Sequence, residues 1–290
     1  MTAVRDATTE LVTVAGGLDH PEGVAWHDGC LWCGTEHGEL LRIDPADGSH
    51  EVVARTGGFL LGLAFDGAGV CFACDVGTAR VLRIEPDGSY EPLVDAVAGR
   101  RLRSPNFPAL SPDGTLWVSD SGSAWGNDDG FLFRVRPGAD PEIVDDACRR
   151  FPNGIAFAPG GERLYVVESR LPGVSTYDVR DGRVGERVEL LRLEGTVPDG
   201  LAFAADGALY IGCWRPDRVY RLSPGGALEI YLDDYTGEYL TTPTNLAFGG
   251  PDGRTLFLAS LSGWSIRALT TESRGLDLAR PRRSPGRHAG

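Results

Sequence analysis

Basic residues are few in this sequence, and long hydrophobic stretches are absent. Over 290 residues, 28 Lys and Arg stand against 41 Asp and Glu, so the formal net charge is −13. Nucleic acids and anionic membranes attract basic surfaces, and we expect neither as a partner. No run of about 18 apolar residues is present to span a membrane, and the first residues, MTAVRDATTELVTV, lack the basic start and apolar core of a secretion signal. We therefore expect a cytoplasmic protein.

Several enzyme motifs are also missing. The sequence has no G-x-S-x-G, no H-E-x-x-H, no P-loop and no G-x-G-x-x-G after a strand. Two cysteine pairs, Cys30 with Cys33 and Cys71 with Cys74, have the spacing of a four-thiolate zinc site. Both pairs lie in expected strands, where residues three apart point to opposite faces. Buried, reduced cysteines are the interpretation we favour.

Glycine and proline, by contrast, are plentiful, with 40 and 19 residues, and they indicate many turns between short strands. One phrase recurs six times: HPEGVAW (from 20), LLGLAFD (60), SPNFPAL (104), FPNGIAF (151), VPDGLAF (197) and TPTNLAF (242). Each copy leads through a glycine-containing turn to further short apolar runs, such as LWVSD, LFRVRP and LEIYLDD. Four short strands per unit at a period of 40 to 47 residues are typical of a propeller blade. We predict an all-β fold, a six-bladed β-propeller, because two stacked β-sandwiches would not repeat one phrase in register.

The two ends of the chain complete this prediction. The sixth unit lacks a clear fourth strand, and a spare strand, ELVTVAG, precedes the first unit. We expect this N-terminal strand to close the last blade, which removes an open sheet edge. Residues 1–275 should therefore form a single domain, whereas residues 276–290, rich in Arg, Pro and Gly, are expected to be disordered.

Each copy of the phrase has one residue at its centre, at the start of the innermost strand. These anchor residues are Glu22, Gly62, Asn106, Asn153, Asp199 and Asn245. In a propeller the starts of the inner strands converge on the central channel, and two buried carboxylates there would repel each other without a partner. A divalent cation would resolve this repulsion. Oxygen ligands alone favour calcium, with magnesium, manganese and zinc as further candidates; the alternative is ordinary turn capping by Asn, Asp and Gly.

Taken together, the phrases HPEGVAW, SPNFPALSPDGTLWVSDSG, FPNGIAFAPGGERLYVVES, VPDGLAFAADGALYIG and TNLAFGGPDGRTLFLAS resemble the senescence marker protein (regucalcin)/gluconolactonase family, over residues of about 12 to 275. That family is similar in fold to diisopropyl fluorophosphatase and the paraoxonases. The resemblance implies one metal in the channel, held by Glu22, Asn153 and Asp199, with Asn106 binding metal or substrate. It also implies a calcium-dependent hydrolase, most often a lactonase.

The sequence departs from the sugar-lactonase pattern in blade 3 and at the first phrase. Phe107 and Ser104 stand where these relatives usually carry Asp and Arg, although Arg103 lies nearby. Val24 follows Glu22-Gly23 where Pro is common in the family. These differences favour a less polar lactone or an ester as substrate over a sugar acid.

The loop after each second strand should rim the pocket. These loops contain Glu36, His37, Asp120, Trp125, Arg170, Trp214, Arg215 and Trp264. Three tryptophans predict an aromatic wall with a few polar groups, although each could instead pack between blades. The expected substrate contacts are Arg103, Asn106, Phe107, Asp120, Trp125, Arg170, Trp214, Asn245 and Trp264.

For the mechanism that the resemblance implies, the cation polarises the carbonyl of a lactone or ester while water attacks. Asp199 would orient or deprotonate that water, and His20, two residues before Glu22, is the alternative base. The cluster Asn127-Asp128-Asp129 offers a second calcium site or, as we favour, an exposed acidic turn.

Two other functions stay open. One is a strictosidine-synthase-like propeller, or a metal-assisted isomerase or cyclase of a biosynthetic pathway. The other is a non-enzymatic propeller that binds calcium or a partner. Turnover of a small-molecule lactone or ester would distinguish the hydrolase from both, whereas the oligomeric state cannot be read from the sequence.

Overall fold

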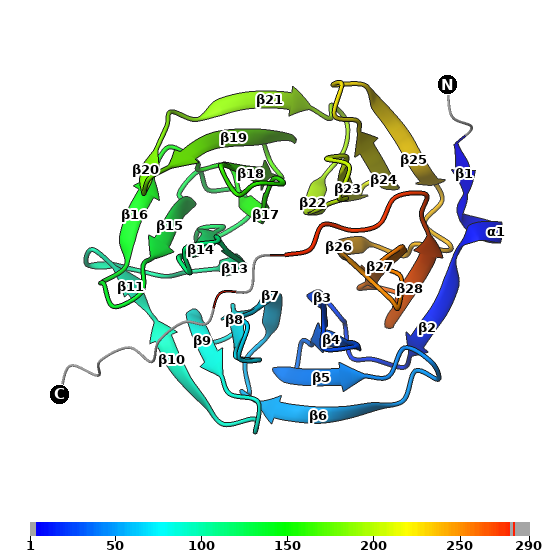
Figure 1. Cartoon of the computed structure of the whole chain (residues 1–290), viewed down its shortest axis with the longest axis horizontal. Coiled ribbons are helices and arrows are strands. Elements are labelled where there is room, and N and C mark those ends of the chain that lie inside the picture. The colour runs from blue at the N-terminus through cyan, green and yellow to red at the C-terminus, as the bar shows by residue number, and fades with distance from the viewer. Residues whose placement is uncertain (1–3, 279–280, 282–290) are drawn as a thin grey trace.

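Six β-sheets surround a central channel in the computed structural model, which describes residues 4–278 and 281 (Figure 1). Each sheet is one blade of a propeller, and its strands run antiparallel from the channel to the outer edge. The predicted all-β, six-bladed propeller is confirmed.

From the channel outward, the strands of the blades are as follows. Blade 1 has β3 (Val24–His27), β4 (Cys30–Gly34), β5 (Glu39–Ile43) and β6 (His50–Arg55); blade 2 has β7 (Leu60–Phe65), β8 (Cys71–Asp75), β9 (Arg80–Ile84) and β10 (Tyr90–Val94). Blade 3 has β13 (Pro105–Leu110), β14 (Leu116–Asp120), β15 (Phe131–Val135) and β16 (Glu142–Asp145); blade 4 has β17 (Pro152–Phe157), β18 (Arg163–Glu168), β19 (Gly173–Arg180) and β21 (Val188–Arg192), and β20 (Arg183–Val184) pairs with the end of β19. Blade 5 has β22 (Pro198–Phe203), β23 (Leu209–Trp214), β24 (Asp217–Leu222) and β25 (Leu228–Asp234); blade 6 has β26 (Pro243–Gly249), β27 (Thr255–Ser260), β28 (Ser265–Thr270) and β2 (Val12–Gly16). A short hairpin of β11 (Ala96–Val97) and β12 (Arg100–Arg101) follows blade 2.

The N-terminal segment closes the ring as predicted. Strand β2 is the outer strand of blade 6 and pairs antiparallel with β28. Before it, β1 (Arg5–Asp6) pairs parallel with β25 of blade 5, and the one-turn helix α1 (Ala7–Glu10) connects the two strands. The N-terminus therefore ties blade 5 to blade 6. Within the described residues, no helix is long and apolar enough to cross a membrane.

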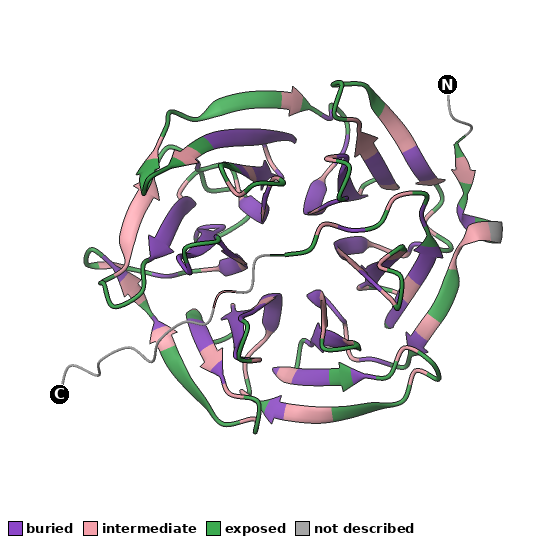
Figure 2. Cartoon of the chain, in the orientation of Figure 1, coloured by how far each residue is buried: buried purple, intermediate pink, exposed green. Residues whose placement is uncertain are grey.

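The hydrophobic core is divided into six clusters, one between each pair of neighbouring blades. Leu61 of blade 2 packs with Phe131 of blade 3, for example, and Phe257 of blade 6 packs with Leu31 of blade 1. Burial is highest on the inner strands and falls toward the outer ones (Figure 2). Because each blade is buried only against its neighbours, the same apolar runs must recur in every unit.

The last described residues cross the channel instead of leaving the domain. In Figure 1 this segment runs over the centre of the ring. Leu276 N donates a hydrogen bond to Phe203 O of blade 5 (2.9 Å), and Leu276 packs against the apolar cluster between blades 4 and 5. The rest of the segment predicted to be disordered, residues 279–280 and 282–290, lies outside the described residues.

The glycine inside the repeated phrase lets neighbouring inner strands approach closely. A Cβ built on Gly23 would lie 1.9 Å from Leu61 O of the next blade. On Gly154 it would lie 2.6 Å from Asp199 O, and on Gly200 it would lie 2.8 Å from Thr244 O. In each case the obstacle is backbone of the next inner strand, which cannot rotate away. The phrase therefore repeats because each blade must bring its inner strand against the next one.

We expect Gly154→Ala to lower the free energy of unfolding by about 3 kcal/mol, the upper range for overpacking of a rigid site. Gly126→Ala is the matched control, because a Cβ at Gly126 meets nothing within 4 Å. Urea unfolding of the two variants and the wild type measures the difference. Equal midpoints for both variants would mean that the inner strands separate without cost.

Candidate metal and substrate site

The repeated phrase forms a β-bulge at the start of the inner strand. In blades 2 to 6 the register with the second strand shifts at this point, between Leu60 and Leu63 in blade 2 and between Pro105 and Phe107 in blade 3. The same shift occurs in blades 4, 5 and 6. Residues inside a bulge leave the ladder, so their side chains can be aimed away from the alternation of the strand. In blades 2 to 6 the bulge therefore sets the orientation of one side chain at the start of the inner strand.

The pairing corrects two of the predicted anchor positions. Leu60 pairs with Asp75 and Pro243 with Ser260, as Pro105 pairs with Asp120. The residue after each of these is the equivalent one, so the ring consists of Glu22, Leu61, Asn106, Asn153, Asp199 and Thr244. Gly62 and Asn245 each lie one residue beyond the ring position of their blade. That position falls two residues before the apolar run, which starts at Leu63 in blade 2 and at Leu246 in blade 6.

Asn245 instead occupies the place that glycine has in blades 1, 2, 4 and 5. Its Oδ1 accepts a hydrogen bond from Leu246 N (2.9 Å), and a Cβ on Gly200 would lie 2.8 Å from the same oxygen. The side chain thus packs against the neighbouring inner strand. This position argues against the predicted contact between Asn245 and substrate.

Glu22 and Asp199 are two neighbouring carboxylates inside the ring, with only 8% and 4% of their surfaces exposed. Burial raises the pKa of Glu22 to about 7. The pKa of Asp199 is raised well above its ordinary value, first by burial and then by the charge of Glu22. Within the described part of the chain, Glu22 Oε2 and Asp199 Oδ1 are buried and have no hydrogen-bond partner. Two unpaired carboxylate oxygens at one point are what a divalent cation would satisfy.

The side-chain amides of Asn106 and Asn153 are each oriented by a hydrogen bond from the amide nitrogen. Asn106 Nδ2 donates to Ser121 Oγ (3.0 Å), and the Ser121 hydroxyl in turn donates to Pro152 O (2.8 Å). Asn153 Nδ2 donates to Ser169 Oγ (3.2 Å), which donates to Pro198 O (2.6 Å). Because each serine proton goes to a backbone carbonyl, the serine can only accept from the amide, and the amide nitrogen must face it.

Ser121 and Ser169 were missed by the sequence analysis. Each follows the carboxylate that ends the second strand, Asp120 in blade 3 and Glu168 in blade 4. These are the two blades that carry the ring asparagines. An acidic residue followed by serine in those two units alone was the available signal. Each serine also links its asparagine to the next inner strand, which ties three ring positions together.

Thr244 is a further ring residue that the sequence analysis did not select. Its Oγ1 donates to the backbone oxygen Glu22 O (3.2 Å), so it links blade 6 to the first ring position. The ring thus has two carboxylates, two amides, one hydroxyl and the apolar Leu61. The residues present fit a hard cation with oxygen ligands.

Trp214 connects this ring to an aromatic wall. Hydrogen bonds from Asn153 and Trp214 lower the pKa of Asp199 against the larger effect of burial. The Trp214 ring lies 6.0 Å from that of Trp125, and the Trp125 ring lies 4.8 Å from that of Phe151. Trp125 is 44% exposed, so it has an open face. The structure therefore brings Trp125 and Trp214 together, and Phe151 is a member of the wall that the sequence analysis missed.

His20 lies in a second polar cluster. Trp264 Nε1 donates to His20 Nε2 (3.1 Å), and because an indole nitrogen can only donate, the imidazole proton must sit on Nδ1. Nδ1 lies 2.8 Å from Glu36 Oε2 and 3.2 Å from Asp19 Oδ1. Both ring nitrogens are engaged, so His20 has no free lone pair with which to act as a base in this arrangement.

Two further predicted rim residues, Asp120 and Arg170, bind other groups of the protein. Asp120 is fully buried, and its carboxylate accepts hydrogen bonds from the backbone N–H groups of Arg103, Ser104 and Gly122. Its role is to hold a loop, which argues against a contact with substrate. Arg170 forms an ion pair with Asp128.

The turn Asn127-Asp128-Asp129 is not arranged as a calcium site, and Phe107 does not lie at the predicted substrate rim. Asp129 accepts hydrogen bonds from Ser123, whereas the Asp128 carboxylate faces Arg170, so the two carboxylates of this turn do not converge. Phe107 lines a cavity beyond the ring, at the opposite end of the inner strands, and not the rim.

The six cysteines are all free, and five of them are buried.

Comparison with known proteins shows which family the chain resembles. The family model of the SMP-30/gluconolactonase/LRE-like region matches residues 20–262. A 6-deoxy-6-sulfogluconolactonase of Pseudomonas putida is 31% identical over 249 residues, which cover 79% of this chain and 78% of the relative.

Two solved structures share the fold. A gluconolactonase of Xanthomonas campestris has a TM-score of 0.78 at 24% identity, over 90% of this chain and 89% of that chain. The calcium-binding protein regucalcin of Agrobacterium tumefaciens strain C58 has a TM-score of 0.78 at 18% identity, over 98% of this chain and 100% of that chain. At these identities the likeness concerns the fold alone.

Proposed function

The chain belongs to the SMP-30/gluconolactonase/LRE-like family, and we propose that it is a metal-dependent hydrolase that opens the ring of a lactone. One observation carries the proposal: two neighbouring carboxylates, Glu22 and Asp199, are buried in the channel with an unpaired oxygen each. A pair of this kind is unfavourable unless it binds a cation or shares a proton.

Glu22, Asn153 and Asp199 would hold the metal, with Asn106 as a further ligand or a contact to substrate. Calcium suits this set because carboxylate and amide oxygens are its preferred ligands. When bound, the cation would act as a Lewis acid toward the carbonyl oxygen of the lactone. The fold shared with regucalcin, described as a calcium-binding protein, is consistent with calcium.

Asp199 is the group that we assign to the attacking water. Its carboxylate is buried in the ring, and Asn153 and Trp214 lie close enough to lower its pKa against the effect of burial. A carboxylate in the ring can orient a water molecule and accept its proton, as a general base does. Asp199 would therefore orient the water and take its proton. We favour it over His20, both of whose ring nitrogens are engaged.

The aromatic wall determines the class of substrate in this proposal. Trp125, Phe151 and Trp214 offer apolar ring faces next to Asp199. Arg170 could also contact a substrate near this wall, but its guanidinium is already paired with the carboxylate of Asp128. A lactone with an apolar face fits this wall, whereas the Pseudomonas putida relative is named for a sulfonated sugar lactone. Aryl esters are the second class that the wall would accept.

Hydrolysis of a panel of sugar lactones, apolar lactones and aryl esters tests the function. We expect acid release that stops with chelator and returns with calcium, and a preference for the apolar lactones. Trp125→Ala should raise the KM of an apolar lactone about tenfold, through loss of stacking area, with little change for a sugar lactone. Val188→Ala, which removes an exposed apolar side chain of blade 4, is the control.

Two other outcomes would redirect the assignment. Calcium binding without turnover of any compound on the panel would contradict the hydrolase and favour an isomerase, a cyclase or a binding protein. Turnover that is insensitive to chelator would contradict the metal-dependent mechanism. Glu22 and Asp199 would then be a pair of carboxyl groups that share a proton instead of binding a cation.

A further inference from the structure

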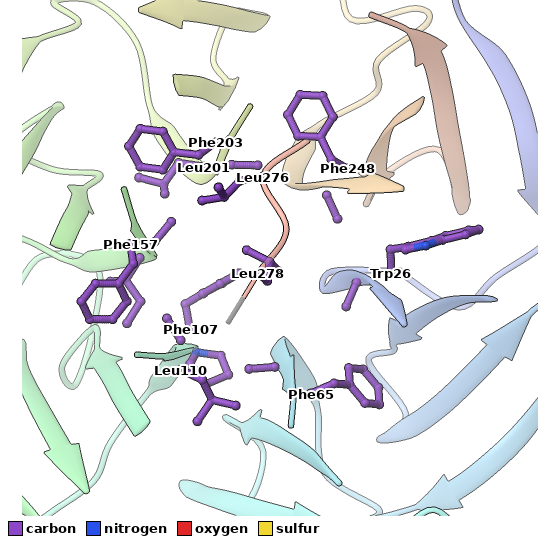
Figure 3. A pocket seen from close by; sticks show the side chains of 18 of the residues that line it. Trp26, Phe65, Phe107, Leu110, Phe157, Leu201, Phe203, Phe248, Leu276 and Leu278 are labelled. Carbon is purple, nitrogen blue, oxygen red and sulfur yellow. The ribbon is translucent and has the colours of Figure 1, made fainter. Parts of the chain in front are cut away.

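Beyond the ring, at the opposite end of the inner strands, the channel widens into a cavity of about 310 Å³ (Figure 3). We call it the far chamber. The ring residues stand at the start of each inner strand, whereas the chamber is lined by the residues that follow along the same strands. It is therefore a separate space from the candidate metal site, on the same axis.

The chamber exists because one small residue recurs in every blade. The inner strands each place an alanine in its lining: Ala25, Ala64, Ala109, Ala156, Ala202 and Ala247. All six alanines are partly exposed, although the residues before them are buried between blades. Larger side chains at these positions would fill the channel. The alanine that all six copies of the repeated phrase share thus keeps this space open.

Most side chains that line the chamber are apolar. Around the alanines lie Trp26, Phe65, Phe157, Phe203 and Phe248, which Figure 3 shows around the cavity. Among the described residues that line it, Asp277 alone carries a charge, and its carboxylate is bound to Arg274 (2.7 Å).

The C-terminal segment Leu276–Leu278 lies across the chamber, and we call it the strap. It starts at Gly275, where a Cβ would lie 2.1 Å from the Cβ of Phe248, so the chain approaches the wall very closely there. Leu276 is anchored by its hydrogen bond to Phe203 O. Leu278 lines the chamber yet stays 63% exposed, so it does not fill the space beneath it.

We propose that the far chamber is a binding site for a compact, uncharged, apolar small molecule, separate from the metal site. Its volume is at the lower end of the range of roughly 300 to 1,000 Å³ found for small-molecule pockets. Apart from Asp277 and the indole N–H of Trp26, the described lining has no charged or hydrogen-bonding side chain, which selects a ligand without charge. The strap covers the bound molecule on the open side.

Two other occupants fit less well. The chain's own end, RRSPGRHAG, has no large apolar side chain to insert. A second protein would need an apolar surface around the opening, but Leu278 is the one large exposed apolar residue, among those described, that lines the chamber. A small molecule needs neither.

The test uses N-phenyl-1-naphthylamine, a neutral apolar dye that fluoresces when it leaves water. We expect the wild type to bind it with the same affinity with and without chelator. Ala156→Leu and Ala202→Leu fill the chamber and should each weaken binding at least about tenfold, since overfilling a packed site costs about 1–3 kcal/mol. Ala139→Leu makes the same change in an exposed turn and should leave binding unchanged.

A second variant keeps the test decisive if the leucine variants fold poorly. Leu278→Asp places a charge at the opening of the chamber, and because Leu278 is 63% exposed, the fold should tolerate it. We expect it to weaken dye binding at least about tenfold, because an apolar site excludes a nearby charge. Trp125→Ala should leave dye binding intact. Absence of binding to the wild type, equal binding by all variants, or loss of binding in Trp125→Ala would each overturn the proposal. None of these outcomes depends on lactone hydrolysis.

Discussion

Asp199→Asn is expected to lower kcat/KM for lactone hydrolysis at least about a thousandfold, within the range of roughly 10²–10⁴ for loss of a general base, with loss of a metal ligand charge added. Asparagine keeps the size and one oxygen of the aspartate, so the bulge and the packing of Gly154 against this strand should survive. It cannot carry the charge or accept the proton from water. Initial rates at several substrate concentrations, with calcium in excess, measure the effect.

Asp75→Asn is the matched control for this loss. Asp75 is a fully buried carboxylate of blade 2 that is not one of the ring residues, and its Oδ1 accepts backbone hydrogen bonds from Phe59 and Thr78. The amide oxygen of asparagine can accept the same bonds, so we expect nearly wild-type activity. If Asp199→Asn kept more than a tenth of the activity with an unchanged melting temperature, Asp199 would be neither base nor essential ligand.

Calcium is expected to raise the melting temperature by roughly 8 °C at a thousandfold excess over its Kd, through a stabilisation of about 4 kcal/mol. This gain should be larger at pH 8 than at pH 5.5. In the metal-free protein, burial raises the pKa of Glu22 from its ordinary value of 4.5 to about 7. Protons and calcium therefore compete for this carboxylate below about pH 7.

The same shift predicts how the metal-free protein depends on pH. A carboxyl whose pKa is raised by folding binds its proton more tightly in the folded state. Below the unfolded pKa of 4.5, Glu22 is protonated in both the folded and the unfolded state, so it does not lower the free energy of unfolding. As pH rises from 4.5 to about 7, the free energy of unfolding falls, and above about pH 7 it levels off. Asp199, raised in the same direction, adds to this trend.

Glu22→Gln isolates the contribution of this carboxylate. Without metal, we expect Glu22→Gln to melt at a higher temperature than the wild type at pH 8, and at a similar temperature at pH 5.5. The variant should also lose most of the gain from calcium. Glu194→Gln, a change at an exposed carboxylate, should behave like the wild type. A wild type and Glu22→Gln that respond equally to calcium would show that Glu22 does not hold the ion.

If both results hold, the ring is one unit in which binding and chemistry are coupled. Glu22 would supply mainly affinity, and Asp199 would supply affinity and the base. The two serines behind the asparagines would then be positioning residues, since Ser121 and Ser169 fix which end of each amide faces the channel. The far chamber stands apart from this unit, because its lining contains no ring residue.

The sequence by itself determined the architecture. Six copies of one phrase predicted six blades, and the missing fourth strand of the last unit predicted closure by the N-terminal segment ELVTVAG, of which Val12–Gly16 forms the strand. Both predictions succeeded because a blade is encoded locally: turn residues, apolar runs and their period lie within fewer than fifty residues. The same phrase singled out Glu22, Asn106, Asn153 and Asp199, whose role as ligands stays a prediction.

Only the tertiary structure decided which neighbours these side chains meet. The β-bulges, which depend on pairing with the second strand, moved the ring from Gly62 and Asn245 to Leu61 and Thr244. Contact between blades 3 and 4 gave the Ser121 hydroxyl its acceptor, Pro152 O, and contacts within blade 3 engaged the Asp120 carboxylate with the backbone before the inner strand. The far chamber arises from six alanines brought together around the axis, together with a strap from the C-terminal end. Such features depend on residues far apart in sequence, and local patterns do not record them.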